Sequence, residues 1–116
     1  MEKAKINSEE DVIRLLGNKT EFEKAVLVAT FKIPKGKVST YKRIAEKISR
    51  PRAYRAVGNA LHKNPLAPVV PCHRVVRSDG GFGGEKEGAE SRKVCLEREG
   101  IPVERDKVKL SEEIFF

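Results

Sequence analysis

The 116-residue sequence has no tryptophan, and it has only two cysteines and two histidines. Two cysteines are too few for a disulfide framework, and neither a CxxC nor a His-x-x-x-His spacing points to zinc. We therefore expect no metal site. A disulfide between Cys72 and Cys95, or a metal site that uses His62 and His73, is the alternative that these residues leave open.

Long apolar runs are also missing. No stretch approaches the roughly 20 apolar residues that a membrane-spanning helix needs. The first residues, Met1 to Ile6, are not followed by the apolar segment of a secretion signal. We therefore expect a soluble cytoplasmic protein, and a chain of this length has the size of one domain.

Acidic residues are outnumbered. The chain has 24 Lys and Arg against 17 Asp and Glu, which gives a formal net charge of +7. An excess of this kind favours a polyanionic partner over an acidic protein or a neutral small molecule. The charge alone leaves both nucleic acid and membrane surfaces open.

Capping residues, glycines and prolines divide the chain into predicted helices. These helices cover residues 8–17, 20–31, 41–48, 53–63 and 89–99. The apolar run around residue 72 predicts a short buried strand, and the last three residues are expected to pack down. The expected fold is mostly α with a short strand segment, a winged-helix-like helix-turn-helix domain over residues 20–116 that follows a short N-terminal extension over residues 1–19.

The third and fourth predicted helices, joined by Ser49-Arg50-Pro51-Arg52, have the pattern of a helix-turn-helix. Their basic residues are opposed only by Glu46, and they are Lys42, Arg43, Lys47, Arg50, Arg52, Arg55 and Lys63. Gly58 lies inside the fourth helix at a cost of about 1 kcal/mol relative to alanine. This glycine predicts close approach by another backbone or by a ligand, although a solvated basic surface is the simpler alternative.

Pro71-Cys72-His73-Arg74-Val75 places a thiol beside an imidazole and an arginine. A thiolate is the nucleophilic form of cysteine, and it needs a basic neighbour, a positive local field and partial access to solvent. The motif therefore predicts a reactive cysteine held on rigid backbone. The alternative is a buried structural cysteine.

Several motifs in this order resemble the DNA-binding domain of O6-alkylguanine-DNA alkyltransferases over roughly residues 21–101. They are Tyr41, Arg55-Ala56-Val57-Gly58, Asn64-Pro65, Pro71-Cys72-His73-Arg74-Val75-Val76 and Glu99-Gly100. The resemblance implies a monomer that binds double-stranded DNA through the minor groove and rotates a damaged guanine out of the stack. It further implies transfer of the alkyl group to a cysteine, once per molecule and without a cofactor.

The resemblance also implies a role for each residue of the reaction centre. Cys72 is then the nucleophile, His73 activates it through a water, and Glu99 orients the histidine. Asn64 braces the turn between the recognition helix and the cysteine segment.

The DNA-contacting residues are implied in the same way. Arg55 fills the gap left by the extruded base, while Tyr41 crowds the 3′ phosphate and contacts that base. The helix that carries Gly58 lies against the groove, and Leu61 packs against the guanine. The backbone carbonyls of Cys72 and Val75 read the exocyclic amine, and we place Ala56 and Arg74 in the same substrate- and DNA-binding set.

The chain departs from the family pattern at two places. Glu85 stands where many members carry a tyrosine at the pocket wall, so that either Glu85 turns outward or Phe82 lines the pocket. The larger N-terminal domain of typical members is missing.

Three other functions compete with alkyl transfer. A protein that recognises alkylated bases without transferring the group is the first, but such proteins commonly have tryptophan in place of the cysteine. A sequence-specific transcription regulator leaves the cysteine motif without a purpose. If the protein were a Cys-His hydrolase, the basic recognition helix would have no function.

Overall fold

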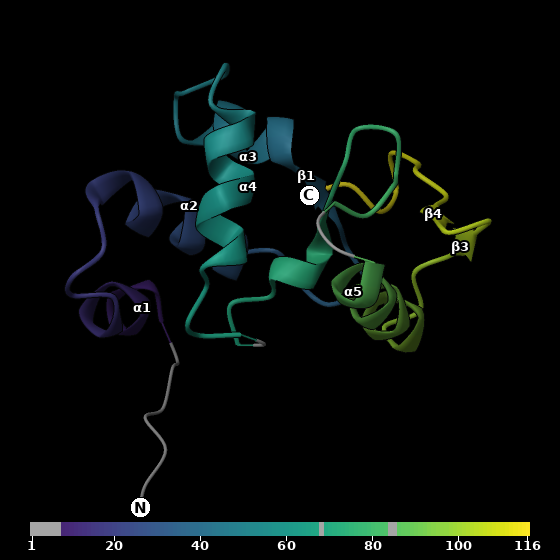
Figure 1. Ribbon diagram of the computed structural model, residues 1–116, viewed down its shortest axis with the longest axis horizontal. Helices are drawn as coiled ribbons and strands as arrows, with labels where there is room; N and C mark the ends of the chain where they lie inside the picture. Colours follow the sequence, from purple (N-terminus) through teal and green to yellow (C-terminus); the bar gives the residue numbers. More distant parts are fainter. Residues whose placement is uncertain (1–7, 68, 84–85) are drawn as a thin grey trace, which may run out of the picture.

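The computed structural model describes residues 8–67, 69–83 and 86–116, and it is mostly helical, as expected (Figure 1). Its helices and strands are short. In chain order they are α1 (Glu9–Leu15), α2 (Glu21–Phe31), β1 (Ser39–Thr40), α3 (Tyr41–Lys47), α4 (Tyr54–His62), the 3-10 helix η1 (Cys72–Arg74), β2 (Val75–Val76), α5 (Lys86–Arg98), β3 (Val103–Glu104) and β4 (Lys107–Val108).

The first two helices begin at the caps that the sequence predicts. The Ser8 hydroxyl accepts a hydrogen bond from the Asp11 N–H, and Thr20 and Glu23 form a complete capping box. Both caps satisfy N–H groups that have no partner inside the helix. Val12 and Leu16, from the predicted N-terminal extension, are buried in the main core, so α1 packs as part of the same hydrophobic core as α2.

Two hydrophobic clusters meet at strand β2. The larger cluster lies among α1, α2, α3 and α4, and the smaller one lies between α5 and the C-terminal segment. Figure 1 shows these two groups of elements on opposite sides of the molecule. Val75 belongs to the first cluster and Val76 to the second, because neighbouring residues of a strand point to opposite faces. β2 pairs in parallel with β1, which leads directly into α3. The Cys72 segment is thereby held against the start of α3.

The connection between α3 and α4 is a tight left-handed turn. Ser49 has a φ of 62°, and the Arg50 N–H donates to the Ala45 carbonyl over 2.8 Å. This 6→1 hydrogen bond is the Schellman pattern that ends many helices. The turn predicted at residues 49–52 is therefore present, and it sets α4 beside α3.

The last three residues of the chain pack against Val38 and α3, which confirms the prediction that they pack down. The Val38 N–H donates to the Ile114 carbonyl, and the Phe116 N–H donates back to the Val38 carbonyl, at 2.7 and 2.8 Å. Arg43 lies over the Phe115 ring and donates to the Phe116 carbonyl, while the Lys47 ammonium lies 3.9 Å from the centre of the Phe116 ring. Two cations of the predicted basic surface are therefore engaged by the chain itself.

Two local predictions were wrong. Cys72 lies in a 3-10 turn rather than in a strand, because only Val75 and Val76 find a pairing partner in β1. The amphipathic pattern of the last predicted helix, residues 89–99, places Val94, Cys95 and Leu96 on the inward face, but Val94 is exposed. On α5 the fully buried residue is Leu96, since the helix presents only a narrow face to the small second cluster.

Candidate active site

Cys72 lies on the wall of a cavity of about 590 Å³, and its thiol is free and partly buried. A volume of this size lies within the range of ligand-binding sites. The described lining residues come from α3, α4, η1, the following loop and α5, and they are Tyr41, Tyr54, Arg55, Gly58, Asn59, Leu61, His62, Cys72, Gly83 and Arg92.

The backbone around Cys72 is held on both sides. The Cys72 N–H donates to the Val70 carbonyl, and the Arg74 N–H donates to the Pro71 carbonyl, each over 2.9 Å. Val70 and Val75, which flank the turn, are fully buried in the larger cluster. The turn therefore presents the thiol to the cavity from rigid backbone, as the sequence predicts.

His73, the residue that follows Cys72, lies in direct contact with Glu99. The His73 Nε2 and the Glu99 Oε2 are 2.8 Å apart, and only 10% and 13% of the two side chains are exposed. Glu99 follows the last turn of α5, where the left-handed Gly100 ends the helix. The end of α5 thus supplies the partner of a histidine from η1.

The charge state of Glu99 determines how His73 is protonated. Burial acts to raise the pKa of Glu99, but hydrogen bonds from Arg74 and His73 outweigh it and hold the pKa below its usual value. An ionised carboxylate only accepts hydrogen bonds, so we assign the proton of neutral His73 to Nε2. Its Nδ1 then keeps a lone pair that can accept a proton.

Arg74 makes its hydrogen bonds within the protein. Its guanidinium grips both oxygens of Glu99, at 2.8 and 2.9 Å, and also donates to the Ile33 carbonyl at 2.7 Å. Only 16% of the side chain is exposed. The expected contact between Arg74 and DNA stays a prediction, and the structure shows that the side chain holds the Glu99 carboxylate in place inside the protein.

Asn64 lies at the joint between α4 and the cysteine segment. Its side-chain amide donates to the Val70 carbonyl over 2.8 Å, and its oxygen accepts from the Leu66 N–H over 2.9 Å. These two bonds close the loop that leads from the end of α4 towards Cys72. The geometry agrees with the bracing position expected for this asparagine.

One face of α4 borders the cavity while another is buried. Arg55 and Ala56 are exposed, Leu61 lines the cavity, and Val57 and Ala60 are buried in the core. A Cβ added at Gly58 would lie 3.8 Å from the Tyr41 ring, which is ordinary van der Waals contact. The protein itself therefore leaves room for a methyl group here, and the close approach predicted from this glycine is not made by its own backbone.

Tyr41 lies between α4 and the loop over residues 77–83, which we call the glycine-rich loop. Its ring faces Gly58, and a Cβ added at Gly83 would lie only 3.1 Å from its hydroxyl oxygen. Burial raises the pKa of Tyr41, and the nearby Cys72 acts in the same direction, whereas Arg92 opposes the shift. Tyr41 is therefore a protonated hydrogen-bond donor at neutral pH.

The two backbone carbonyls expected to read the base differ in their surroundings. The Cys72 carbonyl already accepts from the Val75 N–H, which leaves it one lone pair. Val75 itself is buried and pairs with Ser39 in the parallel ladder.

The sequence analysis missed five lining residues, which are Tyr54, Asn59, His62, Gly83 and Arg92. Asn59 and His62 follow Arg55 at helical spacing, so the face of α4 could have predicted them. Arg92 comes from α5 and carries no local signal. Its guanidinium donates to the Gly83 carbonyl, which ties the glycine-rich loop to α5, and to the Gly88 carbonyl within α5 itself.

The sequence analysis asked whether Glu85 turns outward from the pocket or Phe82 lines it. Glu85 lies outside the residues that the structure describes. Phe82, the other residue considered for the pocket wall, packs with the second hydrophobic cluster. Its neighbour Gly83 borders the cavity instead.

The two cysteines are free thiols. Residues 8–67, 69–83 and 86–116 contain no group of three or more His, Cys, Asp or Glu side chains that could hold a metal ion. Within the same ranges, the helices are too short and too polar to cross a bilayer.

Comparisons with known proteins give consistent matches. Residues 21–101 match the family described as "6-O-methylguanine DNA methyltransferase, DNA binding domain". The chain is 45% identical over 87 residues to the methylated-DNA–protein-cysteine methyltransferase of Methanosarcina barkeri, which covers 75% of this chain and 55% of that protein. A protein of the same name from Saccharolobus islandicus is 43% identical over 82 residues, which covers 71% of this chain and 52% of that protein. The chain thus spans about half the length of the curated relatives it matches.

Two solved structures show the same fold. Mycobacterium tuberculosis OGT in complex with DNA aligns with a TM-score of 0.67 and 40% identity, over 71% of this chain and 51% of that chain. S. pombe Atl1 in complex with damaged DNA containing O6-carboxymethylguanine aligns with a TM-score of 0.74 and 34% identity, over 83% of this chain and 94% of that chain.

Proposed function

Because the chain belongs to the family of the 6-O-methylguanine DNA methyltransferase DNA-binding domain, we propose that it repairs DNA by moving an alkyl group from guanine O6 to Cys72. One observation carries the proposal: a free thiol lies on the wall of a cavity that is also lined by Arg55 of α4, and the residue next to the cysteine, His73, is paired with Glu99. This arrangement joins a nucleophile, a base and an orienting carboxylate to a surface that can bind DNA.

The reaction is a direct displacement. The thiol proton passes to Nδ1 of His73, through a water as in the family, and Glu99 stabilises the imidazolium that forms. The thiolate sulfur then attacks the alkyl carbon, the bond from that carbon to O6 breaks, and its electron pair stays on guanine. A proton returned to guanine completes the leaving group, and a thioether remains on Cys72.

The thioether explains why one molecule acts once. Water does not displace an alkyl group from a thioether under mild conditions, and the reaction needs no cofactor to supply electrons or a second group. We therefore assign to this chain a stoichiometric repair reaction. We further propose that the protein acts as a monomer in the cytoplasm.

DNA is bound through α3 and α4. The exposed face of α4 lies in the minor groove, where Ala56 and Gly58 permit close approach and Arg55 fills the space of the extruded base. The extruded guanine enters the cavity between Tyr41, Leu61 and Cys72. We propose residues 20–116 as the functional domain, and Val12 and Leu16, which precede it in the chain, pack into its core.

A second candidate is recognition of alkylated guanine without transfer. It is favoured by the match to S. pombe Atl1, whose structure contains damaged DNA and of which this chain covers 94%. The presence of Cys72 at the cavity wall favours transfer, because recognition alone needs no nucleophile.

Mass spectrometry distinguishes alkyl transfer from recognition without transfer. After incubation with duplex DNA that carries one O6-methylguanine, the peptide containing Cys72 should gain the mass of one methyl group. Cys72→Ala should abolish the gain while DNA binding persists, and Cys95→Ala, a change at the other thiol, should leave it intact. A folded, DNA-binding protein whose Cys72 peptide stays unmodified would establish the recognition-only function instead.

A further inference from the structure

The C-terminal hairpin contacts the glycine-rich loop, although the hairpin lies outside the residues that match the family. The match ends at residue 101, and the hairpin consists of β3 (Val103–Glu104) and β4 (Lys107–Val108). Figure 1 shows the loop, drawn in green, between α3 on one side and the hairpin on the other. The proposed alkyl transfer gives the hairpin no role.

Backbone contacts join β4 to the loop. The Val108 N–H donates to the Gly80 carbonyl over 2.8 Å, and Gly81 forms an antiparallel bridge with Lys107. The loop is closed on itself by the Arg77 N–H, which donates to the Gly81 carbonyl over 2.9 Å. The loop is therefore paired with the outer edge of the hairpin.

Gly80 lets the two backbones come this close. Its φ is 86°, and a Cβ added at this residue would overlap the Val108 carbonyl oxygen. Gly36 has nearly the same φ, 88°, but a Cβ added there would meet nothing within 4 Å. The close approach at Gly80 is therefore a feature of the contact with the hairpin, separate from the left-handed backbone that both glycines share.

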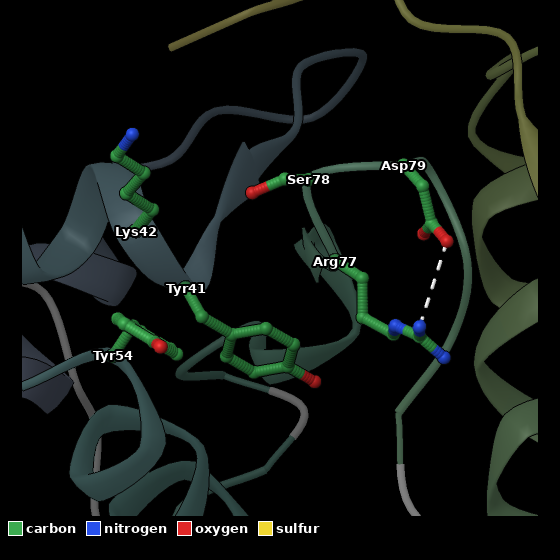
Figure 2. Close-up of a pocket in the computed structure, with 6 residues that line it drawn as sticks. All are labelled: Tyr41, Lys42, Tyr54, Arg77, Ser78 and Asp79. Carbon is green, nitrogen blue, oxygen red and sulfur yellow. Dashed lines mark ion pairs between the residues drawn. The ribbon is translucent and has the colours of Figure 1, made fainter.

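Charged side chains add to the contact. The Asp79 carboxylate accepts from the Gly81 N–H over 2.8 Å, and its Oδ2 lies 3.5 Å from Arg77 and 3.6 Å from Lys107. Figure 2 shows the Arg77–Asp79 pair on the loop, across the opening from Tyr41. The Asp79 and Lys107 side chains are 46% and 58% exposed, so their ion pair is weak. The backbone contacts with β4 are therefore the main attachment of the loop.

The hairpin has anchors of its own. The Lys93 ammonium of α5 lies 2.8 Å from the Asp106 carboxylate in the hairpin turn. Val108 is buried in the second hydrophobic cluster, whereas residues 77–79 of the loop are exposed. A force that separates the two backbones should therefore displace the loop, and the hairpin should stay in place.

The loop ends at the wall of the Cys72 cavity. Gly83 lines that cavity, and a Cβ added there would lie 3.1 Å from the Tyr41 hydroxyl oxygen. Gly83 follows Gly80 closely in the chain, so a shift of the loop at Gly80 also moves the wall that faces Tyr41. The space left beside the thiol decides which transferred group can fit.

We infer that the C-terminal hairpin sets the width of the Cys72 cavity through its contact with Gly80, and so determines the size of the alkyl group that the protein transfers. The inference rests on the proposed transfer function. Gly80 and Val108 act as positioning residues, because they reach the cavity only through Gly83.

Gly80→Ala should narrow the cavity, because the added Cβ pushes the loop away from β4 and towards Tyr41. The measurement is the ratio of two single-turnover rates, on duplexes that carry O6-benzylguanine or O6-methylguanine. A general loss of stability lowers both rates alike, whereas a narrower cavity should lower the ratio by on the order of tenfold. Gly36→Ala carries the same backbone strain without the contact and should keep the ratio. A ratio in Gly80→Ala that does not fall below the ratio in Gly36→Ala would overturn the inference.

Val108→Ala keeps the test decisive if Gly80→Ala does not fold. This change loosens β4 in the second cluster, so the loop can move away from Tyr41, and the same ratio should rise several-fold. Val103→Ala is the matched control, since Val103 pairs with Val108 and β4 lies between it and the loop. Equal ratios in the two valine variants would refute a role for the hairpin.

Thiol reagents test the cavity without DNA. Iodoacetamide and its N-benzyl derivative both alkylate a thiolate with loss of iodide, and they differ in size. In a Cys95→Ala background Cys72 is the remaining thiol. The ratio of the two alkylation rates, bulky reagent over small, should fall in Gly80→Ala and rise in Val108→Ala.

The reagents also separate the inference from the transfer function. If the reagent ratio responds while Cys72 gains no alkyl group from DNA, the transfer function fails and the role of the hairpin stands. If Cys72 is alkylated by DNA while neither ratio responds, the inference fails and the transfer function stands.

Discussion

The imidazole of His73 and the carboxylate of Glu99 lie 2.8 Å apart although 26 positions separate them in the chain. η1 carries the histidine and the end of α5 carries the glutamate, and Arg74 grips the same carboxylate from the other side. The pair is therefore held by three separate segments, since Arg74 is also bound to the Ile33 carbonyl at the end of α2. A base assembled in this way needs little reorganisation when it accepts a proton.

Glu99→Gln should slow methyl transfer to Cys72 by a factor on the order of 100 and leave DNA affinity nearly unchanged. The amide keeps the shape of the carboxylate but removes the charge that stabilises imidazolium. Single-turnover rates on an O6-methylguanine duplex measure the effect, with Glu97→Gln, an exposed change on α5, as the control. An unchanged rate would mean that the histidine does not act as the base.

The pH dependence of stability should report the same carboxylate. Because the folded-state pKa of Glu99 is lowered, its ionised form stabilises the fold above the unfolded value of about 4.5, and this contribution is lost as the pH falls through the lower folded value. Urea midpoints from pH 7 to pH 3 should therefore fall more steeply for the native protein than for Glu99→Gln. Glu23, Asp79 and Asp106 shift in the same direction but are common to both proteins, so parallel curves would contradict the assignment.

The helices could be predicted because their signals are local. Thr20 and Glu23 mark a helix start by themselves, and Gly100 marks a helix end through its positive φ. The 3-10 turn at Cys72 could not be predicted from its apolar neighbours, since strand formation depends on which residues find a partner. Only Val75 and Val76 lie beside β1.

The site residues that belong to a sequence motif could be predicted. The residues that reach the cavity from distant parts of the chain could not. Cys72, His73 and Glu99 lie together as the family resemblance implies. Arg74 belongs to the same motif, but its charge gives no indication that it points inward, because that direction is decided by Glu99 and the Ile33 carbonyl. Arg92 reaches the cavity from α5 only in three dimensions.

Ser39→Ala should stabilise the protein slightly or leave its stability unchanged. The Ser39 hydroxyl is fully buried, and in the part of the chain that the structure describes its oxygen has no hydrogen-bond partner. Removing an unsatisfied buried hydroxyl recovers up to about 1 kcal/mol.

Thr40 serves as the comparison for Ser39, and the stability of both alanine variants is measured by thermal unfolding. Thr40 caps α3 by accepting from the Arg43 N–H at 3.1 Å, so Thr40→Ala should cost about 1 kcal/mol. Equal losses for Ser39→Ala and Thr40→Ala would show that the Ser39 hydroxyl does find a partner.

Arg55→Ala should impair repair of duplex DNA more than repair of single-stranded DNA. Extrusion of a base from a duplex costs a few kcal/mol, and a side chain that fills the gap offsets part of this cost, whereas a single strand has no gap to fill. The ratio of the two single-turnover rates should fall by on the order of tenfold. Arg52→Ala removes the same charge from the turn before α4 and should lower both rates alike; an equal response of the two variants would count against a gap-filling role.

Gly58→Ala should make the protein more stable and a poorer DNA binder. Alanine is favoured over glycine inside a helix by about 1 kcal/mol, and the added Cβ would meet the Tyr41 ring at an unstrained 3.8 Å. The same methyl group stands on the face of α4 that lines the Cys72 cavity, so it pushes the helix away from the groove. Thermal unfolding and duplex affinity should therefore change in opposite directions. Ser91→Ala, on an exposed position of α5, should give a smaller gain in stability with no loss of affinity. If Gly58→Ala raised stability and kept full affinity, the groove would lie elsewhere, because a helix laid against DNA at this residue has no room for the methyl group.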